Sequence, residues 1–190
     1  NYPASLRDSV SLANLGGDFG VFGNQNTQSV GKGRSYGLEV AAQQQLTDQL
    51  YGTFAYTLYR SEFTAFDAGD FSRSSWDNRH LISFVGGYRF GAERTWELSA
   101  KWRFLGGRPY TPYDIEQSVA IYPVTGLGVR DFERLNEAET RVFSQLDLRL
   151  DKRWFYDNWT LNIFLDIQNA TATNNLQPPD FTLQRTADGS

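Results

Sequence analysis

The chain of 190 residues contains no cysteine and no methionine, and it has a single histidine. Without cysteine there is no disulfide framework, no thiolate metal site and no cysteine nucleophile. No run approaches the roughly 18–20 apolar residues that a transmembrane helix needs, and the first residues lack the basic and apolar regions of a signal peptide. These absences exclude a disulfide-stapled scaffold, a cysteine enzyme and a helical membrane span.

A strong excess of charge of either sign is also missing. The chain has 18 basic and 22 acidic residues, and its net charge is -4 at pH 7. Nucleic-acid binding needs Lys and Arg clustered on one face, so this balance argues against a nucleic-acid partner. The first residue is not methionine, which indicates an internal piece of a longer protein.

Apolar and polar residues alternate with period two over several segments of about ten residues, which predicts an all-β fold. We expect six strands, at about 35–46, 50–60, 80–90, 95–105, 143–154 and 158–168. One face of these strands is apolar at about 27 of 32 positions, with Lys152 as its only charge. The opposite face carries most of the charged residues. Alternation alone does not say which face is inside, because a soluble sandwich buries the apolar face and a membrane barrel turns it toward lipid.

The lengths of strands and loops favour the membrane barrel. Strands of ten or eleven residues match the roughly 9–11 that cross a bilayer at a tilt, whereas soluble strands typically have about 5–6. The connections alternate between short turns and long loops. This pattern is typical of outer-membrane barrels, which have short periplasmic turns and long extracellular loops. With the short turns placed in the periplasm, residues 1–33 are expected to be an extracellular loop with a short strand around 10–12. The predicted fold is therefore an antiparallel, up-and-down transmembrane β-barrel.

Four segments carry a resemblance to a known family. They are GKGRSYGLEVAAQQQLTDQLYGTFAYTLYRSEF, SSWDNRHLISFVGGYRF, KWRFLGGRPYTPYD and QLDLRLDKRWFYDNWTLNIFLDIQNA, in this order. Together they resemble the C-terminal barrel of TonB-dependent outer-membrane receptors of the Bacteroidetes type. The resemblance implies that the chain is a single partial domain, about a quarter to a third of a barrel of about 22 strands.

The resemblance also implies a function. Such a receptor takes up a scarce ligand across the outer membrane of a Gram-negative bacterium, driven through the TonB energy-coupling complex. Its partners are that complex, its own plug domain and, in some cases, a surface lipoprotein. This chain lacks the plug and the TonB-contacting segment, and no cofactor is implied. The ligand is left open among siderophore, cofactor, oligosaccharide and peptide.

Two groups of residues are candidates for contacts. Tyrosine and arginine give large contact areas at low entropic cost, so the extracellular loops offer candidate ligand contacts. They are Trp76, Arg108, Tyr110 and Tyr113. The polar face offers candidate contacts with the lumen and the plug, in which opposite charges are expected to face each other across strands. These are Glu97, Lys101, Arg103, Asp147, Arg149 and Asp151.

Other functions are less well supported. His80 lies in a loop-to-strand segment without partners for catalysis or metal binding, which favours a structural role and no enzyme activity. Four carboxylates, at positions 62, 67, 70 and 77, lack the order of a calcium loop and favour a solvated acidic loop, so no metal site is predicted. The alternative of another class is a soluble secreted β-sandwich or carbohydrate-binding module, with the apolar face turned inward.

Overall fold

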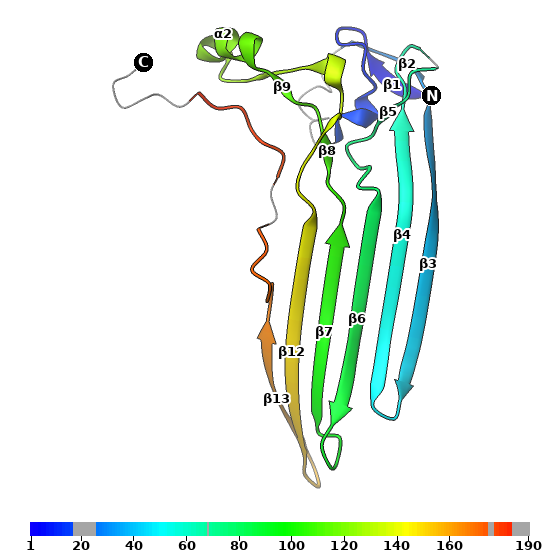
Figure 1. Cartoon of the computed structure of the whole chain (residues 1–190), viewed down its shortest axis with the longest axis vertical. Coiled ribbons are helices and arrows are strands. Elements are labelled where there is room, and N and C mark those ends of the chain that lie inside the picture. Colours follow the sequence, from blue (N-terminus) through cyan, green and yellow to red (C-terminus); the bar gives the residue numbers. More distant parts are fainter. Residues whose placement is uncertain (17–25, 68, 175–176, 184–190) are drawn as a thin grey trace, which may run out of the picture.

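A long antiparallel sheet dominates the computed structural model, which describes residues 1–16, 26–67, 69–174 and 177–183. Six strands run its length in the spatial order β13-β12-β7-β6-β4-β3, so each strand lies beside its neighbour along the chain (Figure 1). Their bounds are β3 (Gly33–Thr47), β4 (Leu50–Phe63), β6 (His80–Phe90), β7 (Trp96–Leu105), β12 (Phe143–Phe155) and β13 (Thr160–Ile167). The predicted antiparallel all-β fold is confirmed, and the six predicted strands agree with these bounds to within three residues.

The sheet is open. In the part of the chain that the structure describes, β3 and β13 form its two edges, and the strands do not close on themselves. The predicted alternation of short and long connections is confirmed: short turns join the strand pairs at one end of the sheet, and the long connections lie at the other end (Figure 1). Two of the short turns rely on left-handed backbone, with φ of 53° at Asp48 and 89° at Gly91. Asp and Gly adopt this conformation more easily than most residues, which explains why the strands reverse there.

The long connections contain regular structure that the sequence did not reveal. At the N-terminal end, β1 (Tyr2–Ser5) pairs with β2 (Thr27–Gly31). The strand predicted around 10–12 is wrong, because Ser11 makes only a single bridge and η1 (Leu12–Asn14) is a 3-10 helix. The expected loop over 1–33 is therefore partly structured, and residues 17–25 lie outside the description.

The other two long connections also contain short strands that form antiparallel pairs. β5 (Ser72–Arg73) pairs with the end of β4. In the connection between β7 and β12, β8 (Pro109–Tyr110) pairs with β11 (Ala138–Glu139), and β9 (Tyr113–Asp114) pairs with β10 (Val129–Arg130). The same connection contains η3 (Phe132–Arg134).

Helix α2 (Ile115–Thr125) lies between β9 and β10 at the loop end of the molecule (Figure 1). It begins where the side chain of Asp114 accepts a hydrogen bond of 2.9 Å from the backbone N–H of Gln117. It ends at Gly126, whose φ of 68° is the left-handed conformation that commonly terminates helices. Local capping thus forms this helix without an apolar stripe.

The buried apolar core lies among the loops and not on the long sheet. Val10, Leu12 and Leu15 are buried together, with Phe132 and Leu135 packed against them. This small cluster joins the N-terminal segment to the connection between β7 and β12. The long sheet therefore has no apolar core of its own among the described residues.

Candidate functional site

The apolar face of the sheet is uncovered across all six strands. Many of its large side chains are exposed, such as Leu165 at 61%, and those of the middle strands, such as Phe84 and Leu148, are partly exposed. Within the described ranges, no second layer of sheet or helix packs over it, and the elements that contact the long strands do so mainly within the sheet or at its loop end. The exposed residues of this face include Tyr36, Leu38, Val40, Leu50, Phe54, Leu98, Leu161, Ile163, Leu165 and Ile167.

Aromatic and polar groups delimit this apolar face at both ends. Toward the loops, Tyr56 Oη lies 2.9 Å from His80 Nδ1, so His80 is part of a structural hydrogen bond on the sheet. Toward the short turns, the rings of Phe90 and Trp96 stack with their centroids 6.2 Å apart. Lys152, the only charge predicted on this face, lies with Nζ 5.0 Å from the centroid of Trp96 and donates a hydrogen bond to Thr95.

On the loop side of the apolar face, at the ends of β3 and β4, an ion cluster replaces the apolar side chains. Glu62 is only 4% exposed and accepts hydrogen bonds of 2.6 Å from both Arg34 and Arg60. Burial on its own would raise the pKa of the Glu62 carboxyl, but the hydrogen bonds from the two arginines outweigh it and hold this pKa below its usual value. The apolar surface therefore ends abruptly at a charged layer.

The polar face, in contrast, is held by side chains from neighbouring strands. Glu97 on β7 accepts a hydrogen bond of 2.7 Å from Tyr51 Oη, and its second oxygen accepts bonds of 2.8 Å from Arg89 and Arg153. The cluster spans four adjacent strands, β4, β6, β7 and β12. Two of its members, Arg89 and Arg153, follow from the alternation, but their contacts with Glu97 depend on strand register.

A second carboxylate on this face has its own arginine. Asp151 accepts two hydrogen bonds of 2.8 Å from Arg149 and one of 3.1 Å from Asn162. Asp151 lies directly opposite Glu97 in the register, so at this point two like charges face each other. At this one pair the expected opposite charges do not face each other, and Asp151 is neutralised by Arg149 of its own strand. For Glu97 the expectation is confirmed, because Arg89 lies directly opposite it on β6 and Arg153 of β12 binds it.

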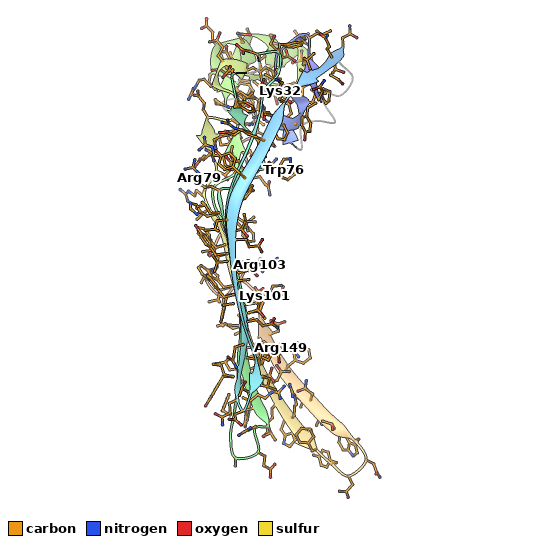
Figure 2. The ribbon with its side chains drawn as sticks, turned by 90° about the vertical axis from the view of Figure 1, so that its right-hand side faces the viewer. Lys32, Trp76, Arg79, Lys101, Arg103 and Arg149 are labelled. Carbon is orange, nitrogen blue, oxygen red and sulfur yellow. The ribbon has the colours of Figure 1, made fainter. Side chains whose placement is uncertain are left out.

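Nearer the loops, the polar face becomes richer in positive charge. Lys101 lies opposite Asp147 in the register and interacts with its charge, although among the described residues its ammonium makes no close ion pair. Asp147 instead accepts hydrogen bonds from the side chain of Gln145 and the backbone N–H of Asn169. Arg103 donates to the Gln145 side-chain oxygen. In Figure 2, Lys101, Arg103 and Arg149 lie on one side of the sheet, with Arg79 on the other.

The four loop residues predicted to contact a ligand are only partly brought together. The guanidinium of Arg108 lies over the ring of Trp76, 5.3 Å from its centroid. Arg108 and Tyr110 line a common cavity of about 350 Å³. Tyr113 lies apart, where it stacks with Arg130 and packs against Phe181.

Two of the four acidic residues considered for calcium are bound by arginines, while Asp67 and Asp70 line one cavity. Glu62 belongs to the arginine cluster above, and Asp77 is paired with Arg73 at 3.0 Å. Burial by itself would lower the pKa of the Arg73 guanidinium, but hydrogen bonds to Glu139 and Asp77 raise it. Asp67 binds the backbone N–H of Gly69. In the described residues, no group of three or more His, Cys, Asp or Glu side chains is placed to hold a metal ion.

No helix within the described ranges has the length and apolar character needed to cross a membrane. Comparison with protein-family models, with curated proteins and with solved structures found no match to this chain.

Proposed function

We propose that this chain forms part of the wall of an outer-membrane β-barrel, with the uncovered apolar face toward lipid and the charged face toward the barrel interior. The observation that carries this proposal is the contrast between the two faces of one sheet. Large apolar side chains are exposed on one face, while carboxylates on the other are satisfied by arginines from the same or neighbouring strands. Soluble proteins seldom expose a continuous apolar surface of this extent.

The dimensions of the apolar face are consistent with a bilayer. Its row from Leu50 to Leu58 on β4 is about 26 Å long, and its row from Tyr36 to Leu46 on β3 about 33 Å, at about 3.3 Å per residue. Strands tilted by about 35–45° would span roughly 18–27 Å, close to the apolar band of about 25 Å in outer-membrane barrels. Tyrosine and tryptophan at both ends match the aromatic girdles of such proteins.

The open edges support a larger barrel than this sheet alone. β3 and β13 each present backbone N–H and C=O groups to the surroundings, and such groups cannot remain unpaired in lipid. Further strands must therefore complete the wall. We infer that these strands belong to the same polypeptide, in a TonB-dependent receptor that takes up a scarce ligand, as the sequence motifs indicate.

The experiment is a fractionation of cells that produce the natural polypeptide containing this sequence, with detection by an antibody against residues 106–142. We expect an integral outer-membrane protein several times longer than 190 residues, whose ligand uptake stops when the proton-motive force is dissipated. A protein that is soluble without detergent would contradict the membrane wall. An integral protein whose uptake continues without the proton-motive force would contradict the receptor.

The soluble β-sandwich is the second candidate, because its inner faces show the same alternation of apolar and polar residues. It requires a second sheet over the apolar face, and none of the described elements occupies that place. A protein that is monomeric without detergent would favour it.

A further inference from the structure

A cavity of about 430 Å³ lies where the polar face meets the long loops. Its lining includes three arginines and three large apolar side chains: Trp76, Arg103, Leu105, Arg108, Arg141 and Phe143. Trp76 and Arg103 lie on the same side of the sheet in Figure 2. The volume is within the roughly 300–1,000 Å³ typical of small-molecule sites.

The arginines of this cavity differ in their partners from the arginines nearer the short turns on the polar face. Arg89, Arg149 and Arg153 each bind a carboxylate. Among the described residues, by contrast, neither Arg103, Arg108 nor Arg141 forms an ion pair with a carboxylate. Arg103 donates to the neutral side chain of Gln145, and the Nε atoms of Arg103 and Arg108 are buried without a hydrogen-bond partner.

Nearby acidic groups offset only part of this positive charge, since Asp147 interacts with the charges of Arg103 and Lys101. Asp147, on the same face, is held by Gln145 and Asn169, and Glu139 is paired with Arg73. Asp180 lines the adjoining cavity of about 350 Å³, which shares Arg108. Lys101, opposite Asp147, adds a further ammonium two residues before Arg103 on β7. The loop end of the polar face therefore attracts anions.

The apolar lining favours an anion with a flat body. Arg108 is stacked over Trp76, and the guanidinium of Arg103 lies 5.9 Å from the centroid of Phe143. A guanidinium stacked on a ring still presents its N–H groups at the edge, where they bind a carboxylate in bidentate fashion. The rings beside it offer an apolar surface for a planar group.

We propose that this cavity binds an organic anion that carries a carboxylate on a flat apolar body. The inference rests on the proposed function and deepens it, since it assigns a chemical class to the ligand taken up. The carboxylate would lie against Arg103 and Arg108, and the flat body against Trp76 and Phe143.

Equilibrium dialysis of the full-length protein in detergent tests this, with naphthalene-2-carboxylate as the probe and naphthalene-2-carboxamide as its neutral analogue. Binding is measured above that of the micelles alone. We expect the carboxylate to bind at least about tenfold more tightly than the amide, because only the carboxylate forms charge-assisted hydrogen bonds. Equal binding of both probes, or binding of neither, would overturn the proposal, and this comparison needs no variant.

Substitutions of single arginines test whether the carboxylate binds in this cavity. Arg108→Gln should weaken carboxylate binding about tenfold or more and leave amide binding nearly unchanged. Arg79→Gln is the matched control, because Arg79 is at the same end of the sheet but on its opposite side (Figure 2). Unchanged carboxylate binding in Arg108→Gln, or an equal loss in Arg79→Gln, would overturn the assigned site. If Arg108→Gln does not assemble, Arg103→Gln replaces it with the same expectation.

The outcomes for the two proposals are distinguishable. A protein that integrates into the outer membrane but does not prefer the carboxylate contradicts only the ligand class. A soluble protein contradicts the membrane wall, whatever it binds.

Discussion

The two faces of the long sheet obtain their stability from different sources. On the polar face, Glu97 and Asp151 are bound by arginines from the same and neighbouring strands, so the protein itself supplies the partners. On the apolar face, side chains such as Phe54 and Leu165 have no covering layer among the described residues. Alternation of residues along a strand therefore specifies two surfaces, and the surroundings must complete one of them.

The largest expected effect comes from an arginine placed on the apolar face, with an arginine on the polar face as its control. Phe54 on the apolar face and Val85 on the polar face are 40% and 42% exposed, and they lie on adjacent strands near the middle of the sheet. In a bilayer, Phe54→Arg should destabilise the protein by about 2–4 kcal/mol and impair assembly, because the charge enters hydrocarbon. Val85→Arg should assemble, at a cost of no more than about 1 kcal/mol from Lys101, which lies directly opposite it. Heat-modifiable mobility on gels of the membrane fraction measures assembly, and equal behaviour of the two variants would contradict a lipid-facing surface.

The polar face can be broken at its best-connected carboxylate. Glu97→Gln removes the shared partner of Arg89 and Arg153, and we expect a loss of about 2 kcal/mol in the free energy of unfolding. Glu39→Gln is the control, because Glu39 lies on the same face but makes no side-chain contact of this kind in the described chain. Guanidinium unfolding in detergent measures both variants. Equal effects would mean that the arginine contacts of Glu97 do not stabilise the sheet.

The ion cluster beyond the apolar rows should respond to pH. The pKa of Glu62 is lowered in the folded protein, so its stabilisation is fully present above the usual value of about 4.3 and is lost as the pH falls through the lower folded value. Glu62→Gln should therefore reduce the free energy of unfolding by about 1 kcal/mol at pH 7, since both arginines are partly exposed. At pH 3 the difference from the wild type should be smaller. A difference that grows as the pH falls would contradict this assignment.

The smallest effect is expected at the short-turn end, where Arg94 and Asp48 are 3.6 Å apart and largely exposed. Arg94→Gln should change the free energy of unfolding by about 0.5 kcal/mol or less, because solvent screens such pairs. The same unfolding experiment measures it. A loss above about 1 kcal/mol would show that this turn contributes more than a surface contact does.

The sequence predicted the strands and their faces because alternation is a local property that each strand carries by itself. It did not predict which arginine binds which carboxylate, because the contacts of Glu97 depend on the register of four strands. It missed α2 because this helix lacks an apolar stripe, although Asp114 three residues before Gln117, with Gly126 at the other end, was an available signal. Nor could proximity in the sequence show that Tyr110 lines the Arg108 cavity while Tyr113 packs against Phe181.

Nitroxide labelling tests most directly whether lipid covers the apolar face. Because the chain has no cysteine, Phe54→Cys and Val85→Cys each introduce one labelling position into this part of the wall. In vesicles, we expect a label at position 54 to collide readily with oxygen and little with a water-soluble nickel complex, and a label at 85 to show the reverse. If the label at 54 is reached by the nickel complex, or shielded from both reagents by protein, the apolar face does not contact lipid.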